Sequence, residues 1–272
     1  MPRTSFTESV ELHSIADRVE VAPGVAMPRL GLGTSLAVGD SAVRAMLAAF
    51  DVGYRLVDTS ANYGNEEEVG RAVAVSGLPR EELFITTKLE KTDQGLSHPR
   101  PALESSLRRL ALDHVDLYLI HWPKPAFTNQ TWQAMEALLH AGLTRSIGVS
   151  NFEVSDLEQL LTTVVVTPAV NQIKLNPAEQ RRELHAYCAQ RGIAVEAWAP
   201  VMRGHVGELP VLARVGAEHG KTPAQVALRW LLQKGAIAIP KSVHESRVRE
   251  NADIYDFRLG PEDMRAIDRL GV

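Results

Sequence analysis

The stretch LFITTKLEKTDQGLSHPRPALESSLRRLALDHVDLYLIH, residues 83–121, contains two short apolar runs, 83–88 and 117–121, on either side of the amphipathic segment 101–110. Short runs rich in Ile, Thr, Phe and Tyr are typical of buried strands, whereas apolar residues that recur every three to four positions are typical of a helix. This stretch therefore predicts a strand, a helix and a second strand that runs parallel to the first.

The same alternation continues on both sides of this unit, with a new strand-length run about every 25 to 35 residues. Strands are expected at residues 30–32, 56–58, 83–88, 117–121, 146–150, 170–174, 194–198 and 236–241. Further amphipathic helices are expected at residues 40–52, 131–141 and 222–234. Eight such units suit closure into a (β/α)8 TIM barrel, an α/β fold, better than an open sheet, but their number alone leaves the open sheet as the alternative.

The residues before the first unit fall into two parts. Residues 1–18 mix polar side chains without periodicity and are expected to form an N-terminal extension. Residues 19–21 and 25–27 flank Pro23-Gly24, which predicts either a β-hairpin at the bottom of the barrel or an irregular lead-in. Residues 19–272 are expected to form one barrel domain, since a TIM barrel takes about 250 residues.

Composition limits the partners and the compartment. Lys and Arg number 29 against 33 Asp and Glu, so the net charge is −4 and no nucleic-acid-binding face is expected. No apolar stretch reaches the roughly 18 residues of a membrane span, and residues 1–18 lack the apolar core of a secretory signal. The single cysteine, Cys188, excludes an intrachain disulfide and is either a buried helix residue or a reactive thiol. We therefore expect a cytoplasmic monomer that binds a small molecule.

Polar side chains stand at the carboxyl ends of successive predicted strands, where a barrel builds its active site. Asp58, Lys88 and His121 end three of these strands, and Tyr63 lies in the loop after Asp58. A lysine beside a tyrosine lowers the pKa of the phenol from about 10 toward the working pH, which would make Tyr63 a proton donor. Asp58 would keep Lys88 charged, and neutral His121 could donate a hydrogen bond that orients a carbonyl oxygen.

Each of these residues also has a purely structural interpretation. Asp58 and Lys88 could form an internal ion pair, and His121 could be a hydrogen-bonded core histidine. Their joint position at consecutive strand ends favours a site that polarises and protonates a carbonyl group. Because the sequence shows no redox metal site and no cysteine pair, we expect no metal, and the hydride would come from a bound cofactor.

Motifs of two other enzyme classes are incomplete. Gly31-Leu32-Gly33 is followed by Leu36, where the dinucleotide-binding fingerprint requires a third glycine. Residues 148–152, GVSNF, lack the final glycine of a hydrolase nucleophile elbow. A Rossmann dehydrogenase and a serine hydrolase are therefore not expected.

Five strings in the sequence resemble the signatures of the aldo-keto reductases. They are residues 55–66 (RLVDTSANYGNE), 84–88 (FITTK), 116–123 (DLYLIHWP), 148–152 (GVSNF) and 239–243 (IPKSV). The resemblance runs from about residue 19 to the C-terminus, and it is nearest to bacterial 2,5-diketo-D-gluconic acid reductases through residues 141–151, 196–200 and 220–225. It implies a barrel enzyme that reduces aldehydes, ketones, dicarbonyls or keto sugars with NADPH. Tyr63 would be its general acid, Lys88 and Asp58 would tune that acid, and His121 would orient the carbonyl.

The resemblance also implies how the cofactor is bound. Ser150, Asn151 and Gln172 would hydrogen-bond the nicotinamide carboxamide, and Trp198 would stack on the ring. Further contacts are implied for Thr34, Lys241, Ser242, Val243, Arg247, Glu250 and Asn251. Without the resemblance, Lys241 and Arg247 would be interpreted as exposed solubilising charges. Two cations and a hydroxyl around one phosphate indicate NADPH or NADP rather than NAD.

The resemblance assigns Ser35, Glu90 and Trp122 to the substrate pocket. Glu90 stands where family members usually carry tryptophan, and Ser35 stands where an aromatic residue is common. These replacements would admit bulkier or more polar substrates. Glu90 would either attract a cationic substrate or be a solvent-facing carboxylate.

Two other functions compete with carbonyl reduction. One is an NADPH-binding regulatory module resembling the potassium channel β subunits, and the other is a barrel isomerase or lyase without a cofactor. The presence of Asp58, Tyr63, Lys88 and His121 together favours the reductase over both.

Overall fold

A sheet of eight parallel strands is the centre of the computed structural model, which describes residues 9–271. The strands pair in sequence order, and they are β3 (Leu32–Gly33), β4 (Leu56–Asp58), β5 (Phe84–Leu89), β6 (Leu117–Ile120), β7 (Ile147–Ser150), β8 (Val170–Lys174), β9 (Ala194–Trp198) and β10 (Ile237–Ala238). Parallel bridges from Leu30 to Ala238 and from Gly33 to Lys241 join the two ends of the sheet. The sheet therefore closes into the (β/α)8 barrel that the sequence predicts.

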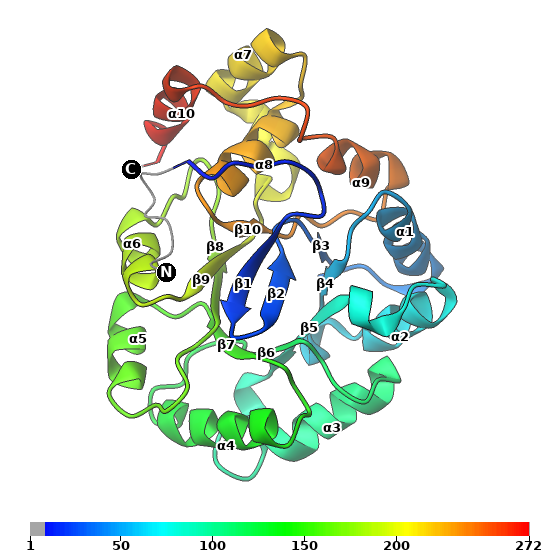
Figure 1. The fold of residues 1–272 in the computed structure, drawn as a ribbon, viewed down its shortest axis with the longest axis vertical. Helices are drawn as coiled ribbons and strands as arrows, with labels where there is room; N and C mark the ends of the chain where they lie inside the picture. The colour runs from blue at the N-terminus through cyan, green and yellow to red at the C-terminus, as the bar shows by residue number, and fades with distance from the viewer. Residues whose placement is uncertain (1–8, 272) are drawn as a thin grey trace.

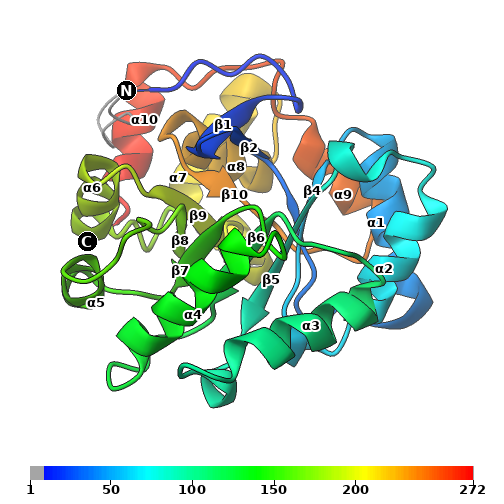
Figure 2. The ribbon, with the colours of Figure 1, turned by 60° about the horizontal axis from the view of Figure 1, so that its bottom comes forward.

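Helices surround the barrel, as Figures 1 and 2 show. They are α1 (Gly39–Asp51), α2 (Glu66–Val75), α3 (Pro99–Leu110), α4 (Thr128–His140), α5 (Val154–Leu161), α6 (Arg182–Gln190), α7 (Pro210–His219), α8 (Pro223–Gln233), α9 (Glu245–Ala252) and α10 (Pro261–Asp268). Their apolar faces pack against outward-facing strand residues such as Val57, Ile85 and Ile120. No helix within residues 9–271 is long and apolar enough to cross a membrane.

The start of α8 illustrates how the sequence sets the helix bounds. Thr222 precedes the helix, and its hydroxyl accepts a hydrogen bond from the Gln225 amide, while the Gln225 side chain accepts one from the Thr222 amide. Pro223 occupies the first helical position, where its missing amide hydrogen costs nothing. These contacts fix the helix to begin at Pro223.

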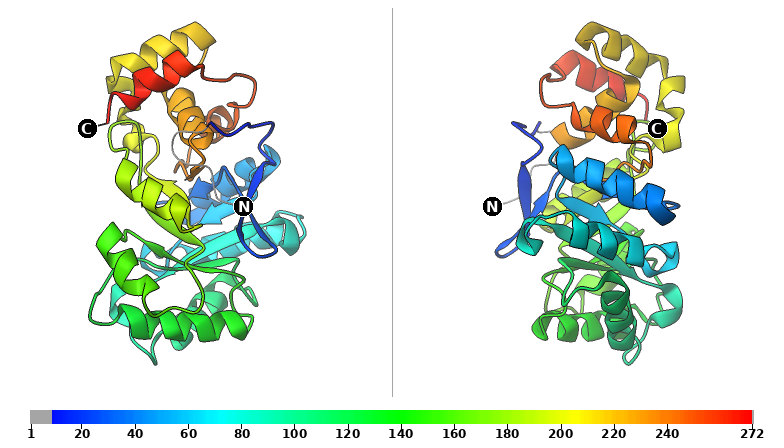
Figure 3. Two further views of the ribbon diagram at one scale, coloured as in Figure 1. Left: turned by 60° about the vertical axis from the view of Figure 1, so that its left-hand side comes forward. Right: turned by 90° about the vertical axis from the view of Figure 1, so that its right-hand side faces the viewer.

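A two-stranded antiparallel hairpin, β1 (Arg18–Ala22) and β2 (Val25–Pro28), covers one end of the barrel. Its Met27 is buried in the same apolar cluster as Leu56 and Phe84, which are the first residues of β4 and β5. Figure 1 looks onto the hairpin, and Figure 3 shows it on one side of the molecule. The predicted hairpin at the barrel bottom is therefore confirmed, and the carboxyl ends of the strands lie at the opposite end.

The N-terminal segment 9–17 lies against the outside of the barrel. The Val10 amide donates a hydrogen bond to the Gln233 carbonyl at 2.7 Å, and Leu12 is buried. Ile15 lies over Gly53, where φ is +104° and an added Cβ would come within 2.7 Å of the Ile15 side chain. Glycine is therefore required at position 53 both by its backbone conformation and by this contact. Residues 1–8 of the expected extension lie outside the described residues.

Several predicted element ends differ from the observed ones. The strand expected at 236–241 is only Ile237–Ala238, because Pro240 has no amide hydrogen to continue the ladder. The strand expected at 30–32 is Leu32–Gly33, with Leu30 joined to the barrel by a single bridge. The helix expected at 131–141 is Thr128–His140.

Cys188 is buried in α6. Burial raises the pKa of its thiol to about 12, although a contact from the Asn171 amide opposes this. A thiol that stays protonated is a poor nucleophile. The buried-residue interpretation of Cys188 is therefore the correct one of the two that the sequence left open.

Candidate active site

Three adjacent strands bring the predicted catalytic residues together. Asp58 is the last residue of β4, Lys88 is the last but one residue of β5, and His121 directly follows β6. β4 pairs with β5 and β5 pairs with β6, all in parallel, so their carboxyl ends meet. Tyr63 ends a short 3-10 turn, η1 (Ala61–Tyr63), that begins three residues after Asp58 and is followed by Gly64 with φ of +65°. The loop thus returns Tyr63 toward the strand ends.

The Lys88 ammonium is the centre of this cluster. Its Nζ lies 2.7 Å from Asp58 Oδ1, 2.9 Å from the Thr59 carbonyl oxygen and 3.4 Å from the Tyr63 hydroxyl. The side chain is fully buried. Burial by itself lowers the pKa of Lys88, but the charge of Asp58 and the contacts with Tyr63 and Asp58 outweigh it, so the pKa lies above its ordinary value. Lys88 is therefore a fixed positive charge beside the Tyr63 hydroxyl.

The pKa of Tyr63 shifts in the direction opposite to the one expected from its lysine neighbour. Burial raises the pKa of Tyr63 above 10.0, and the charge of Lys88 lowers it by less. The negative charges of Asp58 and Glu90 also raise it. The phenol therefore keeps its proton at neutral pH, with the ammonium of Lys88 placed to stabilise the oxygen once the proton has left.

His121 contacts two side chains that the sequence did not connect with it. Its Nδ1 lies 2.7 Å from Glu90 Oε1, and the same carboxylate oxygen accepts a hydrogen bond from the Ser60 hydroxyl at 2.8 Å. The His121 ring meets the Tyr63 ring nearly edge-on, with 5.9 Å between centroids. The carboxylate of Glu90 is thus paired inside the protein, an arrangement that neither interpretation of Glu90 from the sequence anticipated.

A buried amide connects the cluster to the barrel interior. Gln172 Nε2 donates hydrogen bonds to Asp58 Oδ2 at 2.8 Å and to Glu196 Oε2 at 2.7 Å. Glu196 is fully buried in β9, where burial and then the charge of Asp58 raise its pKa. The sequence analysis gave Glu196 no role, but a charged residue inside the apolar strand AVEAW was the signal that could have found it.

The residues expected to bind the nicotinamide carboxamide form a second hydrogen-bonded group beside the first. Trp198 Nε1 donates to Asn151 Oδ1 at 2.9 Å. Asn151 Nδ2 lies 3.0 Å from both Ser150 Oγ and the His121 carbonyl oxygen, and Ser150 Oγ donates to the Gln172 carbonyl oxygen. Asn151 adopts a left-handed backbone with φ of 61°, a conformation that asparagine tolerates better than most residues.

Apart from Thr34, the other residues expected to contact the cofactor lie farther along the chain, after β10. Lys241 and Arg247 are exposed, Ser242 and Asn251 are buried, and Val243 and Glu250 are partly buried. Lys241 is bridged to Gly33, next to Thr34, whose hydroxyl donates to the Asp58 carbonyl oxygen at 2.9 Å. The chain therefore brings this third group to the same end of the barrel as Asp58.

Two predicted pocket residues lie at the rim of the cluster. Trp122 is 46% exposed, and its ring is stacked near that of His121 with 6.4 Å between centroids. Ser35 is partly buried in the loop after β3. Trp122 therefore leaves part of its aromatic surface exposed at this end of the barrel.

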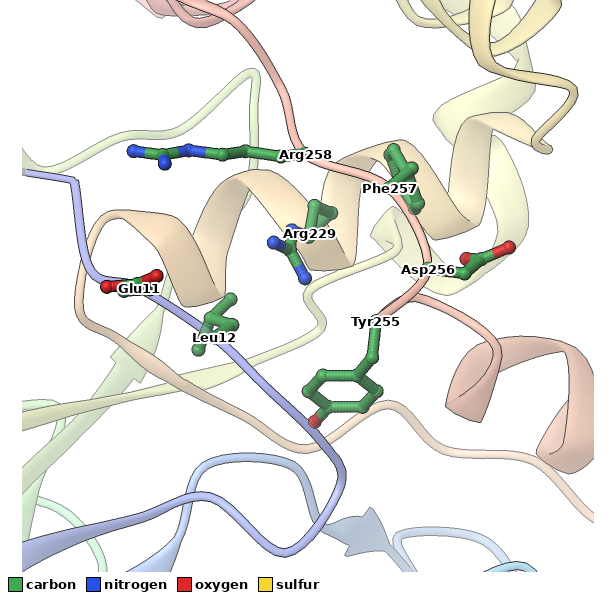
Figure 4. Close-up of a pocket in the computed structure, with 7 residues that line it drawn as sticks. All are labelled: Glu11, Leu12, Arg229, Tyr255, Asp256, Phe257 and Arg258. Carbon is green, nitrogen blue, oxygen red and sulfur yellow. The ribbon is translucent and has the colours of Figure 1, made fainter.

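A separate cavity of about 260 Å³ lies between the N-terminal segment, α8 and the segment after α9, as Figure 4 shows. It is lined by Glu11, Leu12, Arg229, Tyr255, Asp256, Phe257 and Arg258. None of the predicted site residues lines it, so it is distinct from the cluster at the strand ends.

The barrel and its buried Lys88–Asp58 pair beside a tyrosine define a class of oxidoreductases that act on carbonyl groups. The chain belongs to the Aldo/keto reductase family, whose profile matches residues 29–271. Members of this family use nicotinamide cofactors.

Similar proteins agree with this assignment. The chain is 48% identical to the glyoxal reductase of Bacillus subtilis strain 168 over 258 residues, which cover 94% of each protein. It is 44% identical to the methylglyoxal reductase DkgA of Escherichia coli K12, over 93% of this chain and 92% of that protein. The crystal structure of an aldo/keto reductase from Brucella melitensis matches with a TM-score of 0.90 and 43% identity, over 93% of this chain and 99% of that one.

Proposed function

We propose that this aldo-keto reductase reduces small dicarbonyl compounds of the glyoxal and methylglyoxal kind with NADPH, and that Tyr63 is the proton donor. The observation that carries the proposal is the position of the Lys88 ammonium, 2.7 Å from Asp58 and 3.4 Å from the Tyr63 hydroxyl. The names of the relatives in Bacillus subtilis and Escherichia coli support the substrate class.

Tyr63 protonates the carbonyl oxygen as the carbonyl carbon is reduced. The phenol holds its proton at neutral pH, because burial raises its pKa. As the proton moves to the substrate, negative charge develops on the phenol oxygen, and the neighbouring Lys88 ammonium stabilises it. Asp58 keeps Lys88 charged and in place. A positioned general acid of this kind contributes about 10²- to 10⁴-fold to the rate.

A bound nicotinamide would supply the hydride, and the residues near Tyr63 fit such a cofactor. Both amide hydrogens of Gln172 are directed at carboxylates of the barrel interior, which leaves its carbonyl oxygen to accept a hydrogen bond from the carboxamide. Trp198 is partly exposed and offers an aromatic face. The exposed cations Lys241 and Arg247 favour the extra phosphate of NADPH.

The test is a steady-state assay of NADPH and NADH oxidation by the purified protein, with glyoxal, methylglyoxal and simple aldehydes as substrates. We expect turnover of both dicarbonyls and a higher kcat/KM with NADPH than with NADH. NADPH binding without turnover of any carbonyl would overturn the proposal and favour the regulatory module. Absence of NADPH binding would favour an isomerase or a lyase.

A further inference from the structure

The pairing of Glu90 with His121 determines which nitrogen of the imidazole faces the substrate. Leu89 and Ile120 are paired across β5 and β6, so the residues that follow them leave the sheet side by side. Glu90 Oε1 lies 2.7 Å from His121 Nδ1, and the Ser60 hydroxyl lies 2.8 Å from the same oxygen and 3.2 Å from Nδ1. The His121 side chain is 10% exposed and the Glu90 side chain 20% exposed, so water competes little for this contact.

The hydrogen atom in this contact belongs to His121. An ionised carboxylate only accepts hydrogen bonds, and Ser60 already donates its own hydrogen to Glu90 Oε1. Burial alone would raise the pKa of Glu90, but the hydrogen bonds from His121 and Ser60 outweigh it, so the pKa lies below its ordinary value and Glu90 is ionised at neutral pH. Nδ1 is therefore the nitrogen that carries hydrogen.

This assignment changes the hydrogen bond that neutral His121 can make with a substrate. A neutral imidazole has one N–H, and when Nδ1 holds it, Nε2 carries a lone pair and can only accept. Nε2 lies on the side of the ring away from Glu90 and Ser60. The expectation from the sequence was that neutral His121 donates a hydrogen bond to the carbonyl oxygen, and the Glu90 contact is incompatible with that tautomer.

We propose that Glu90 is a positioning residue that holds the proton on Nδ1 of His121, so that Nε2 accepts a hydrogen bond from a hydroxyl on the carbon next to the reacting carbonyl. The substrates so selected are α-hydroxy aldehydes, α-hydroxy ketones and dicarbonyls whose second carbonyl is hydrated to a diol. This inference rests on the proposed carbonyl reduction and adds a specificity to it.

The arrangement of the two rings suits such a substrate. The Tyr63 hydroxyl donates to the oxygen of the reacting carbonyl, and His121 Nε2 accepts from the oxygen on the neighbouring carbon. The rings are 5.9 Å apart between centroids and inclined by 78°, so both can contact one two-carbon unit. The charged and titratable groups around His121 are Glu90, Tyr63, Lys88 and Asp58, and of these four only Glu90 forms a hydrogen bond with the ring.

The first test reads the tautomer directly and needs no turnover. ¹⁵N NMR of the imidazole in the whole protein at neutral pH is expected to show hydrogen on Nδ1 and a lone pair on Nε2, and hydrogen on both nitrogens would contradict the proposal. Glu90→Ala is expected to lose this pattern, because no acceptor then holds the Nδ1 hydrogen. Ser60→Ala, which keeps the Glu90 carboxylate, is expected to retain it. The same tautomer in the wild type and in Glu90→Ala would overturn the proposal.

The second test measures the specificity. Glycolaldehyde and propionaldehyde have the same number of heavy atoms, and a hydroxyl in one replaces a methyl in the other. We expect the ratio of their kcat/KM values to fall by roughly threefold to tenfold in Glu90→Ala, the loss of one hydrogen bond. Comparing the ratio between proteins cancels the hydration of each aldehyde in water. An unchanged ratio would contradict the proposal.

A control separates this contact from general effects of charge. Glu208→Gln removes a carboxylate that lies 2.7 Å from Nδ1 of the exposed His205, and it is expected to leave both the ratio and the activity unchanged. Failure of carbonyl reduction itself would appear as no turnover of either aldehyde, while the tautomer spectrum would still decide the role of Glu90. The two proposals can therefore fail separately.

Discussion

Lys88 Nζ lies 2.7 Å from Asp58 Oδ1 and 3.4 Å from the Tyr63 hydroxyl, and the side chains of Lys88 and Asp58 are both buried. A buried ion pair adds little net stability by itself, because desolvation of both charges offsets their attraction. Breaking it by removing one partner is costly, since the remaining charge has no counterion. The pair is therefore best explained by what it does for Tyr63.

Replacing Asp58 by asparagine keeps the shape of the side chain and removes its charge. We expect the free energy of unfolding to fall by about 3 to 5 kcal/mol, because Lys88 is then a buried cation without a carboxylate partner. Urea denaturation measures this change. The matched control is Asp40→Asn, which breaks the exposed pair with Arg71 at 2.7 Å and should cost no more than about 1 kcal/mol. Equal effects of the two substitutions would contradict the account.

The cations after β10 should select the cofactor. If Arg247 binds the extra phosphate of NADPH, as we propose, Arg247→Ala removes a charged donor from it, so we expect KM for NADPH to rise by roughly tenfold to a hundredfold while KM for NADH changes little. Arg249→Ala is the control, since Arg249 is an exposed arginine of the same helix and lies 4.0 Å from Asp51. Equal changes in KM for both cofactors would show that Arg247 does not contact that phosphate.

His185 should make the stability depend on pH in the mildly acidic range. Burial lowers the pKa of His185 in α6 from 6.5 to about 4, and the charge of Lys234 acts in the same direction. As the pH falls, the His185 imidazole therefore binds a proton near pH 6.5 in the unfolded chain but only near pH 4 in the folded chain. Stability from this group is complete above pH 6.5 and falls by about 3 kcal/mol as the pH drops to 4.

Urea denaturation at several pH values between 7 and 4 checks this prediction. His185→Leu should show a smaller loss of stability on acidification than the wild type, because it has no imidazole to protonate. His205→Leu, which changes an exposed histidine, should follow the wild type. Identical pH dependence in the wild type and His185→Leu would show that another group controls it.

Much of the fold was predictable because strand and helix periodicities are local properties of the sequence. The strands at 56–58, 170–174 and 194–198 have the predicted bounds, whereas β10 is shorter than expected because Pro240 interrupts its ladder. The barrel rule that active sites lie at strand carboxyl ends was enough to bring Asp58, Lys88 and His121 together.

The electrostatics of the cluster could not be predicted in the same way. The pKa of Tyr63 depends on the balance between its burial and the charge of Lys88, and burial is a property of the folded chain. The contact between Glu90 and His121 depends on the register of β5 and β6 and on side-chain rotamers. Glu196 received no role from the sequence, because its contact with Gln172 depends on the register between the adjacent strands β8 and β9.

The most direct test of the central claim compares Tyr63→Phe with the wild type in NADPH oxidation by methylglyoxal. Tyr54→Phe is the matched control, because Tyr54 is also buried and its hydroxyl contacts the Val248 carbonyl oxygen instead of Lys88. If Tyr63 is the proton donor, its replacement lowers kcat by about 10²-fold or more and leaves NADPH binding intact, while Tyr54→Phe turns over like the wild type. A Tyr63→Phe enzyme with kcat within a few-fold of the wild type would contradict the account.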